Sequence, residues 1–334
     1  PFRHQVENLM RFCRRLPVTL LADDVGLGKT ISAGLILAEL MKRNRVKRVF
    51  IICPKILIEQ WQEELASKFG IASVGLTGSE LRGASNRREP VVITTYQSAT
   101  NYLLKKKANE FDMLILDEAH KVRNLHGSSA GPPKMAKAIY GALESRLFKY
   151  VLMLTATPIQ NRLWDIYSLV DCLAVARGHR NPLGSASEFN NRFIADGKNK
   201  ARQLVPENAE EFRRIVGTYM FRTRRMDADL AFPERIVQTY PVHVSRLEQS
   251  LQNLIAENLH LFNALNRVNL LVALMSSPQA LAAQLENMAR SGTGSGSLAR
   301  EVQDVVRSLQ IPAKAQQLVE IANTLRQQRK DWRM

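Results

Sequence analysis

Short apolar runs alternate with helical patterns along most of the N-terminal two-thirds of this chain, and this alternation limits the possible folds more than any other feature. The runs are dense in β-branched and aliphatic residues, as buried strands are, and lie at residues 18–23, 48–53, 91–96, 113–120 and 150–157. Residues 29–43 and 55–69 instead carry apolar residues at helical spacing. Continuous apolar strands that alternate with helices indicate a parallel sheet covered on both faces. Ligands of such sheets bind beyond the carboxyl ends of the strands, where polar residues follow these runs.

Composition limits the class of protein. The chain has 334 residues, of which 45% are apolar, so we expect a globular protein with a large core. It contains no apolar run of roughly eighteen or more residues, so we expect no membrane span. Three distant cysteines in apolar surroundings suit buried thiols in a reducing compartment: Cys13, Cys53 and Cys172. The net charge of +16 favours polyanions, although a basic surface kept for solubility or an acidic partner would also account for it.

The segment LADDVGLGKT, residues 21–30, joins the first predicted strand to the first predicted helix. Backbone N–H groups at a helix start point at phosphate oxygens, and the helix dipole favours anions. Gly26 and Gly28 allow close approach of the backbone and positive φ angles. Lys29 would contact the β- and γ-phosphates, and the Thr30 hydroxyl would ligate magnesium. The segment predicts a phosphate loop, with a tight strand–helix turn as the alternative.

Two further strand ends carry polar residues that suit the same chemistry. Asp117 at the tip of the run LILDEAH can hold magnesium, and Glu118 beside it can orient and deprotonate an attacking water. A solvated turn or a helix cap is the alternative. Thr155 and Thr157 follow the run that begins at residue 150, and they suit a relay that senses the γ-phosphate through hydrogen bonds to the acidic pair. An ordinary turn would look the same there.

Three segments in this order, LADDVGLGKT, LILDEAHKVRN and LTATPIQNRLWDIYSLVDCL, resemble the first motor lobe of the Swi/Snf-type ATPases in helicase superfamily two. Loops of this superfamily commonly read AxxxGxGKT, so Ala22 and the acidic Asp23 fit the family pattern. Most members read DEMGLGKT, whereas this chain reads DDVGLGKT, which keeps acid, acid and apolar character. The resemblance implies an α/β fold, a RecA-like P-loop domain with a central, mostly parallel sheet, plus a helical extension.

The resemblance also implies ligands and site residues, with ATP and magnesium as the cofactors. Gln5, in PFRHQVENLMRF, is the residue expected to read the adenine base. The implied nucleotide-binding set is Gln5, Gly26, Leu27, Gly28, Lys29 and Thr30. The implied catalytic residues are Lys29, Asp117 and Glu118, and the implied metal ligands are Thr30 and Asp117. His120, Thr155 and Thr157 would couple nucleotide state to lobe closure, although His120 also suits a core histidine. The segments CPKILIEQWQEEL, with Trp61 matching, and ITTYQS imply nucleic-acid contacts at Pro54, Lys55, Thr94, Thr95 and Tyr96.

After about residue 236 the strand-like apolar runs end and helical patterns follow, which suggests that the chain has three parts. Residues 1–235 are expected to form the ATP-binding motor lobe, which ends in MFRTRRMDADLAFPER, where Arg222 and Arg225 lie near arginine positions of the family. Residues 236–300 are expected to form a helical protrusion. It would hold a long helical pattern over 245–277, a helix over 278–290 and a flexible loop over Ser291–Ser297. Residues 301–334 resemble a linker helix toward a second RecA-like lobe, so we expect a piece of a longer protein.

The implied activity is that of an ATPase that moves on duplex DNA without strand separation. Its partners would be nucleic acid and the second RecA-like lobe of the same full-length protein, which supplies arginine fingers, and we expect no membrane partner. Two alternatives stay open: an RNA helicase or RNA-polymerase remodelling ATPase, and a non-hydrolysing scaffold. The segment LMSSPQALAAQL resembles bacterial members related to the RNA-polymerase-recycling translocases. We expect a monomer in the bacterial cytoplasm, associated with the nucleoid, or a nuclear protein if the source is eukaryotic.

Overall fold

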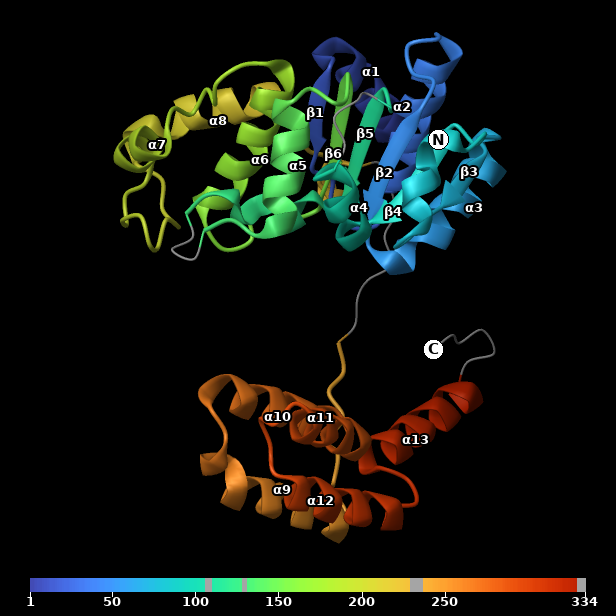
Figure 1. Ribbon diagram of the computed structural model, residues 1–334, viewed down its shortest axis with the longest axis vertical. Helices are drawn as coiled ribbons and strands as arrows, with labels where there is room; N and C mark the ends of the chain where they lie inside the picture. The colour runs from blue at the N-terminus through green and yellow to red at the C-terminus, as the bar shows by residue number, and fades with distance from the viewer. Residues whose placement is uncertain (106–109, 128–130, 229–236, 329–334) are drawn as a thin grey trace. The chain divides into compact units, whose positions relative to one another are not determined.

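The computed structural model describes residues 1–105, 110–127, 131–228 and 237–328 (Figure 1). The chain divides into two compact units, Pro1–Phe232 and Pro233–Met334. The predicted boundary between residues 235 and 236 lies outside the described residues, as does the FPER end of the segment that resembles the close of the motor lobe.

The N-terminal unit is built on a seven-stranded sheet with the order β3-β4-β2-β5-β6-β1-β7. Each strand pair among the described residues is parallel. The strands are β1 (Val18–Leu21), β2 (Val49–Cys53), β3 (Ser73–Gly75), β4 (Val91–Thr95), β5 (Met113–Asp117), β6 (Tyr150–Leu154) and β7 (Met220–Phe221). The five apolar runs of the sequence are therefore strands, and the parallel α/β sheet is confirmed. Asp117 is the last residue of β5, while Asp23 and Thr155 follow the ends of β1 and β6.

Helices cover both faces of this sheet (Figure 1). They are α1 (Arg3–Arg15), α2 (Lys29–Lys42), α3 (Ile58–Phe69), α4 (Tyr96–Leu103), α5 (Lys134–Glu144), α6 (Leu163–Arg177), α7 (Ala186–Phe193) and α8 (Ala209–Tyr219). Successive strand side chains point to opposite faces. Ile51 accordingly packs in a core with side chains of α1, α2 and α3, whereas its neighbours Phe50 and Ile52 belong to the core formed with α4, α5 and α6.

Two short strands extend the sheet beyond what the sequence indicates. β3 has three residues and β7 has two, so neither gives an apolar run long enough to stand out. β7 pairs with β1 through Leu20–Met220 and Leu21–Phe221. The chain therefore returns to the strand that leads into the glycine loop after about 200 residues, and this return positions the segment that follows β7 beside that loop.

The predicted burial of the three cysteines is wrong for one of them. Cys53 and Cys172 are buried, but Cys13 is exposed. Its neighbour Phe12 is fully buried, because Phe12 takes the face of α1 that packs on the sheet. Adjacent residues of a helix point in different directions, so Cys13 faces solvent.

The described part of the C-terminal unit is helical. Its helices are α9 (Arg246–Asn258), α10 (Ala264–Ser276), α11 (Pro278–Arg290), α12 (Gly296–Ser308) and α13 (Ala313–Gln328). The predicted helical pattern over 245–277 is broken, because Asn263 caps a new helix by accepting a hydrogen bond from the Asn266 N–H at 2.9 Å. The predicted loop Ser291–Ser297 is too long, since Ser295 is the N-cap of α12, whose first residue is Gly296.

Side chains of α9, α10, α11 and α12 form the separate core of this unit, including Leu251, Leu270, Leu285 and Val302. Across the described residues of the chain, no helix has both the length and the apolar character needed to cross a membrane.

Candidate functional site

The phosphate loop connects the end of β1 to the start of α2. Gly26 has φ 87° and Gly28 has φ 72°, both in the left-handed region that glycine adopts without strain. Gly28 is also the N-cap of α2. A Cβ added at Gly28 would lie 2.6 Å from Gln5 Nε2, so the Gln5 amide would have to move to admit a side chain. The loop therefore presents the backbone N–H groups of a helix start, the arrangement that suits phosphate.

Lys29, the first residue of α2, folds back over the loop. Its Nζ donates to the carbonyl oxygens of Asp23 at 3.0 Å and Asp24 at 3.4 Å. Burial lowers the pKa of Lys29, while the charges of Glu118 and Asp117 raise it. The ammonium thus lies within electrostatic reach of the acidic pair at the end of β5, as a phosphate-binding lysine must.

The Asp117 carboxylate is fixed by two donors. Its Oδ2 accepts the indole N–H of Trp61 at 2.9 Å, and its Oδ1 accepts the Glu118 backbone N–H at 3.0 Å. The Tyr96 hydroxyl donates to the Asp117 carbonyl oxygen at 2.7 Å. Burial is the main cause that raises the pKa of Asp117, and the Trp61 hydrogen bond opposes it. These contacts hold the carboxylate rigidly at the strand end.

Glu118 adopts a left-handed backbone conformation, with φ 57° and ψ 49°. This is unusual for a residue with a long side chain, and such strain gathers at functional sites. Its Oε2 lies 2.9 Å from His120 Nδ1. The same nitrogen lies 3.2 Å from Thr155 Oγ1, and Thr155 Oγ1 accepts the Thr157 backbone N–H at 3.2 Å. The structure therefore brings together His120, Thr155 and Thr157, which the sequence predicts as coupling residues.

His120 has to share one nitrogen between two partners. A carboxylate only accepts hydrogen bonds, so the contact with Glu118 requires a proton on Nδ1. Burial lowers the pKa of His120, and the Glu118 charge opposes that effect. The neutral imidazole therefore links the acidic pair to the strand end of β6.

The segment before β1 holds the loop from the other side. His4 Nε2 lies 2.8 Å from the Leu27 carbonyl oxygen, and Gln5 Nε2 donates to the same oxygen at 3.3 Å. Gln5 Oε1 also accepts the Phe2 backbone N–H at 2.9 Å. The Gln5 amide thus bonds to the protein on both of its ends. That Gln5 reads an adenine base stays a prediction.

The acidic residue Asp23, which stands where a general phosphate loop has glycine, is fully buried. Its Oδ2 accepts from Asn8 Nδ2 at 2.6 Å, and its Oδ1 accepts the Thr223 backbone N–H at 2.8 Å. Burial raises the pKa of Asp23, and these hydrogen bonds lower it. Asp23 therefore ties the loop both to α1 and to the segment after β7.

Asp24 makes a second connection to that segment. Its Oδ1 accepts from Arg222 Nη2 at 2.7 Å, and its Oδ2 accepts the Arg225 backbone N–H at 3.1 Å. Arg225 Nε also donates to the Val25 carbonyl oxygen at 2.8 Å. Arg222 and Arg225, two of the three arginines of the RTRR segment, thus contact the phosphate loop.

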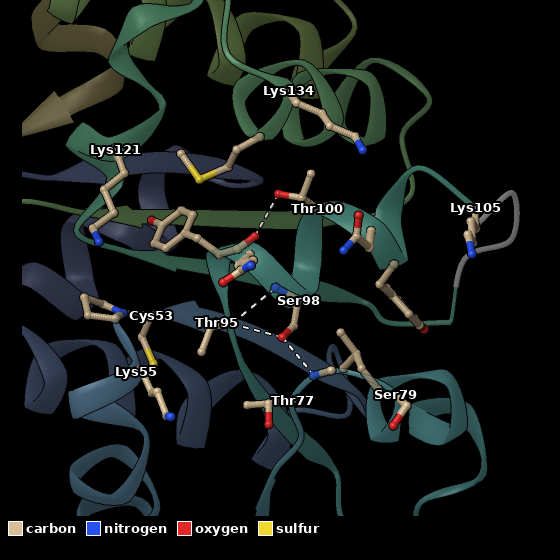
Figure 2. Close-up of a pocket in the computed structure, with 18 of the residues that line it drawn as sticks. Cys53, Lys55, Thr77, Ser79, Thr95, Ser98, Thr100, Lys105, Lys121 and Lys134 are labelled. Carbon is tan, nitrogen blue, oxygen red and sulfur yellow. Dashed lines mark hydrogen bonds between the residues drawn. The ribbon is translucent and has the colours of Figure 1, made fainter. Parts of the chain in front are cut away.

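A basic cavity of about 1530 Å³ opens on the same unit (Figure 2). Pro54, Lys55, Thr95 and Tyr96, four of the five predicted nucleic-acid contacts, line it. None of the described residues that line it is acidic, and its cationic side chains are Lys55, Arg82, Lys105, Lys121, Arg123 and Lys134. Thr94 is not part of the lining, because its buried hydroxyl donates to the Leu76 carbonyl oxygen at 2.6 Å. The Thr94 hydroxyl thus faces away from the cavity, and contact of Thr94 with nucleic acid stays a prediction.

The wall of the cavity is held by hydrogen bonds from the start of α4. Thr95 Oγ1 accepts the Ser98 backbone N–H at 3.2 Å and caps the helix. Ser98 Oγ in turn accepts the Gly78 backbone N–H at 3.0 Å, as the dashed lines in Figure 2 show. The first turn of α4 is thus tied to the loop after β3.

Residues 3–291 match the family described as the SNF2-related domain. The chain belongs to this family. Its similarity to the Bacillus subtilis protein "Uncharacterized ATP-dependent helicase YqhH" is 34% identity over 252 residues, which is 75% of this chain and 41% of that protein. It is 27% identical over 253 residues to the Saccharomyces cerevisiae "DNA repair and recombination protein RDH54", covering 63% of this chain and 26% of that one. The chain thus spans less than half the length of these curated relatives.

The fold has a counterpart among solved structures of the SNF2 family. The "Sulfolobus solfataricus SWI2/SNF2 ATPase core in complex with dsDNA" matches with a TM-score of 0.52 and 22% identity, over 98% of this chain and 64% of that one. At this identity the match shows the fold alone. The resemblance to Swi/Snf-type ATPases and the RecA-like fold with its mostly parallel sheet are both confirmed.

The oxygen ligands that the sequence offers for magnesium fit that ion. Among the residues that the structure describes, no group of three or more histidine, cysteine or acidic side chains could hold a metal by itself. Magnesium is commonly bound through one or two protein oxygens together with substrate phosphates. The Thr30 hydroxyl on the first turn of α2 and the Asp117 carboxylate at the end of β5 are ligands of that kind.

Several site residues are not indicated as such by the sequence. Trp61 lies on the buried face of α3 and reads as packing, although its indole N–H holds Asp117. His4 and Asn8 lie in the adenine-reading segment, and their polar character on the buried face of α1 was the one available signal. Thr223 bonds to Asp23 across 200 positions of the chain, so no local pattern links the two residues.

Proposed function

We propose that this chain is the ATP-binding lobe of a nucleic-acid-dependent ATPase that translocates on double-stranded DNA. The observation that carries the proposal is a shared edge of the sheet. The phosphate loop follows β1 and the acidic pair closes β5, while Pro54 and Tyr96 on the wall of the basic cavity follow β2 and β4. The carboxyl ends of parallel strands meet at one edge, so the nucleotide site and the basic cavity are neighbours.

Each residue of the nucleotide site has a role that its geometry supports. Lys29 and the N-terminus of α2 would hold the negative charge of the β- and γ-phosphates. Thr30 and Asp117 would hold magnesium, which neutralises charge that develops on the phosphate oxygens. Glu118 would accept a proton from the attacking water, and His120 keeps its carboxylate in place through the 2.9 Å contact.

A direct contact joins the basic cavity to the acidic pair. Tyr96 lines the cavity, and its hydroxyl donates to the carbonyl oxygen of Asp117 at 2.7 Å. Lys121, also on the cavity wall, lies 5.5 Å from the centre of the Tyr96 ring. A phosphate backbone bound by the cavity lysines would therefore act on Tyr96, the residue whose hydroxyl bonds to Asp117. This arrangement supports stimulation of hydrolysis by nucleic acid.

The proposal includes a second RecA-like lobe in the full-length protein, since the chain covers only 41% of the Bacillus subtilis relative. An arginine finger from such a lobe is worth about 10³–10⁵ in rate. We therefore expect these residues to bind nucleotide but to hydrolyse it weakly. Duplex DNA is favoured over RNA because the similar proteins include a DNA repair and recombination protein and an ATPase core in complex with dsDNA.

The test is ATP hydrolysis by the full-length protein with no nucleic acid, duplex DNA, single-stranded DNA or RNA. Glu118→Gln is the matched variant, because it keeps the shape of the side chain and removes the base. We expect strong stimulation by duplex DNA, and a loss of about 10²–10⁴ in rate in the variant, with nucleotide binding retained. Stimulation by RNA alone would favour an RNA-directed enzyme. No hydrolysis under any of these conditions would favour a scaffold.

A further inference from the structure

A hollow of about 850 Å³ lies at the amino-terminal edge of the sheet, on the N-terminal unit. Leu16 and Pro17, which lead into β1, are part of its lining, so it is at the opposite end of β1 from the phosphate loop. Its charged lining is contributed by the ends of α1 and α6 and by α8, and consists of Arg14, Arg15, Arg177, His179, Arg213 and Arg214. We call this site the arginine hollow.

The arginine hollow concentrates positive charge without compensation. Five of its side chains are guanidinium groups, and none of its lining residues is acidic. Within the described ranges, no ion pair joins any of these arginines to a carboxylate. Of the two acids on the first turn of α8, Glu210 and Glu211, the second pairs with Arg192 instead. Like charges gathered in this way repel one another, and a bound anion would relieve the repulsion.

Two of the arginines are held in place by the protein. Arg177 Nη2 donates to the Arg15 carbonyl oxygen at 2.7 Å, and its guanidinium lies 4.9 Å from the centre of the Tyr219 ring. Arg15 Nη1 donates to the Met220 carbonyl oxygen at 2.9 Å. Arg177 Nε is buried and has no hydrogen-bond partner. The hollow therefore has two guanidinium groups in fixed positions, in place of freely moving surface chains.

The composition of the hollow favours phosphate groups on a polymer. Guanidinium groups bind phosphate bidentately, and all five cations here are arginine, with no lysine. A protein partner needs an apolar core in its interface, but Leu16 and Pro17 are the only sizeable apolar side chains in the lining. We propose that the arginine hollow is a second binding site for a nucleic-acid phosphate backbone, separate from the basic cavity.

This inference rests on the proposed function, because it assumes that the chain acts on DNA. It adds a contact at the opposite edge of the sheet from the nucleotide. Arg213 and Arg214 are exposed on α8 and take no part in the core. A nucleic-acid phosphate backbone would therefore contact these two residues first. Their removal should change nucleic-acid binding with little effect on folding.

The experiment compares Arg213→Ala/Arg214→Ala with the matched control Arg300→Ala/Arg307→Ala, which removes two exposed arginines from α12 of the other unit. Binding of a fluorescent duplex of about 20 base pairs is measured by anisotropy from about 50 to about 300 mM salt. Each lost phosphate contact reduces the slope of log K against log salt by about 0.9. We expect the hollow variant to lose about 1.8 from the slope and to bind more weakly at low salt, and the control to match the unmodified chain.

The outcomes separate the two proposals. If the unmodified chain does not bind duplex DNA, the proposed function fails as well. If it binds, and the hollow variant has the same slope and affinity as the control, only the second site is refuted. Arg213→Lys/Arg214→Lys keeps both charges and should retain most of the slope. Binding of poly-L-glutamate that the alanine pair abolishes, with DNA binding unchanged, would assign the hollow to an acidic protein partner instead.

Discussion

Replacing Trp61 with phenylalanine removes one of the two donors to the Asp117 carboxylate and keeps an aromatic ring in the α3 core. Trp61 is 1% exposed and Asp117 is 6% exposed, so water cannot readily replace the indole N–H. A hydrogen bond to a charged group is worth about 1.5–3 kcal/mol. We therefore expect Trp61→Phe to lower the free energy of unfolding by about that amount at neutral pH, in addition to the loss from the smaller ring.

The loss of unfolding free energy in Trp61→Phe should depend on pH in a defined direction. The pKa of Asp117 is raised above its ordinary value of 3.8, chiefly by burial, and the Trp61 hydrogen bond holds it down. Removing that bond raises the pKa further. A group with a raised folded-state pKa contributes stability below its unfolded pKa, and this contribution is lost as the pH rises through the folded pKa. The loss of unfolding free energy in Trp61→Phe is therefore largest above the folded-state pKa of Asp117, and it shrinks as the pH falls toward 3.8.

Trp164→Phe is the matched control. Trp164 is also 1% exposed, but its indole N–H donates to the uncharged Lys198 carbonyl oxygen at 3.0 Å. The expected loss from that bond is about 0.5–1.5 kcal/mol, independent of the ionisation of Asp117. Both variants are unfolded in urea and followed by circular dichroism at about pH 7.5 and about pH 4.5. Equal deficits that do not change with pH would refute the assigned role of the Trp61 hydrogen bond.

Two further predictions concern the loop and the thiols. Gly28→Ala should lower the free energy of unfolding by about 1–2 kcal/mol and weaken nucleotide binding. The reason is that φ at Gly28 is 72° and a Cβ there would lie 2.6 Å from Gln5 Nε2. Gly83→Ala, where a Cβ meets nothing within 4 Å, is the control for thermal unfolding and nucleotide titration, and equal effects of the two would contradict the argument. Cys13 should react with a maleimide in the folded chain, whereas Cys53 and Cys172 should react only after unfolding, since both are buried and burial raises the pKa of Cys53 to about 12. Mass spectrometry of the labelled peptides reports this, and modification of all three thiols in the folded chain would show the burial to be wrong.

The parts of the fold that the sequence predicts are those with a strong local pattern. A strand buried on both faces, such as Val49–Cys53, must be apolar at every position, so it stands out from its surroundings. Met220–Phe221 has only two residues, and its place in the sheet depends on pairing with Leu20 and Leu21 far back in the chain. Long-range pairing of this kind leaves no periodic signal.

The same distinction holds for the site. Lys29, Asp117 and Glu118 are predicted because fixed local spacing and a strand end define their chemistry. The hydrogen bond from Trp61 to Asp117 joins residues 56 positions apart. The orientation of Thr94 also escapes a local pattern. Its neighbours Thr95 and Tyr96 line the cavity, whereas alternation along the strand turns the Thr94 hydroxyl inward.

The hydrogen bonds between the phosphate loop and the segment after β7 have a thermodynamic consequence. The Thr223 backbone N–H bonds to Asp23 and the Arg222 side chain to Asp24, so the chain leaves the N-terminal unit through contacts with its own loop. Coupling free energies are reciprocal. A ligand that binds the loop more tightly when these bonds are intact must strengthen them by the same factor. For such a ligand, tension on the chain beyond Arg225 that breaks these bonds would lower the binding affinity by that factor, so occupancy of the loop would report the load on the chain.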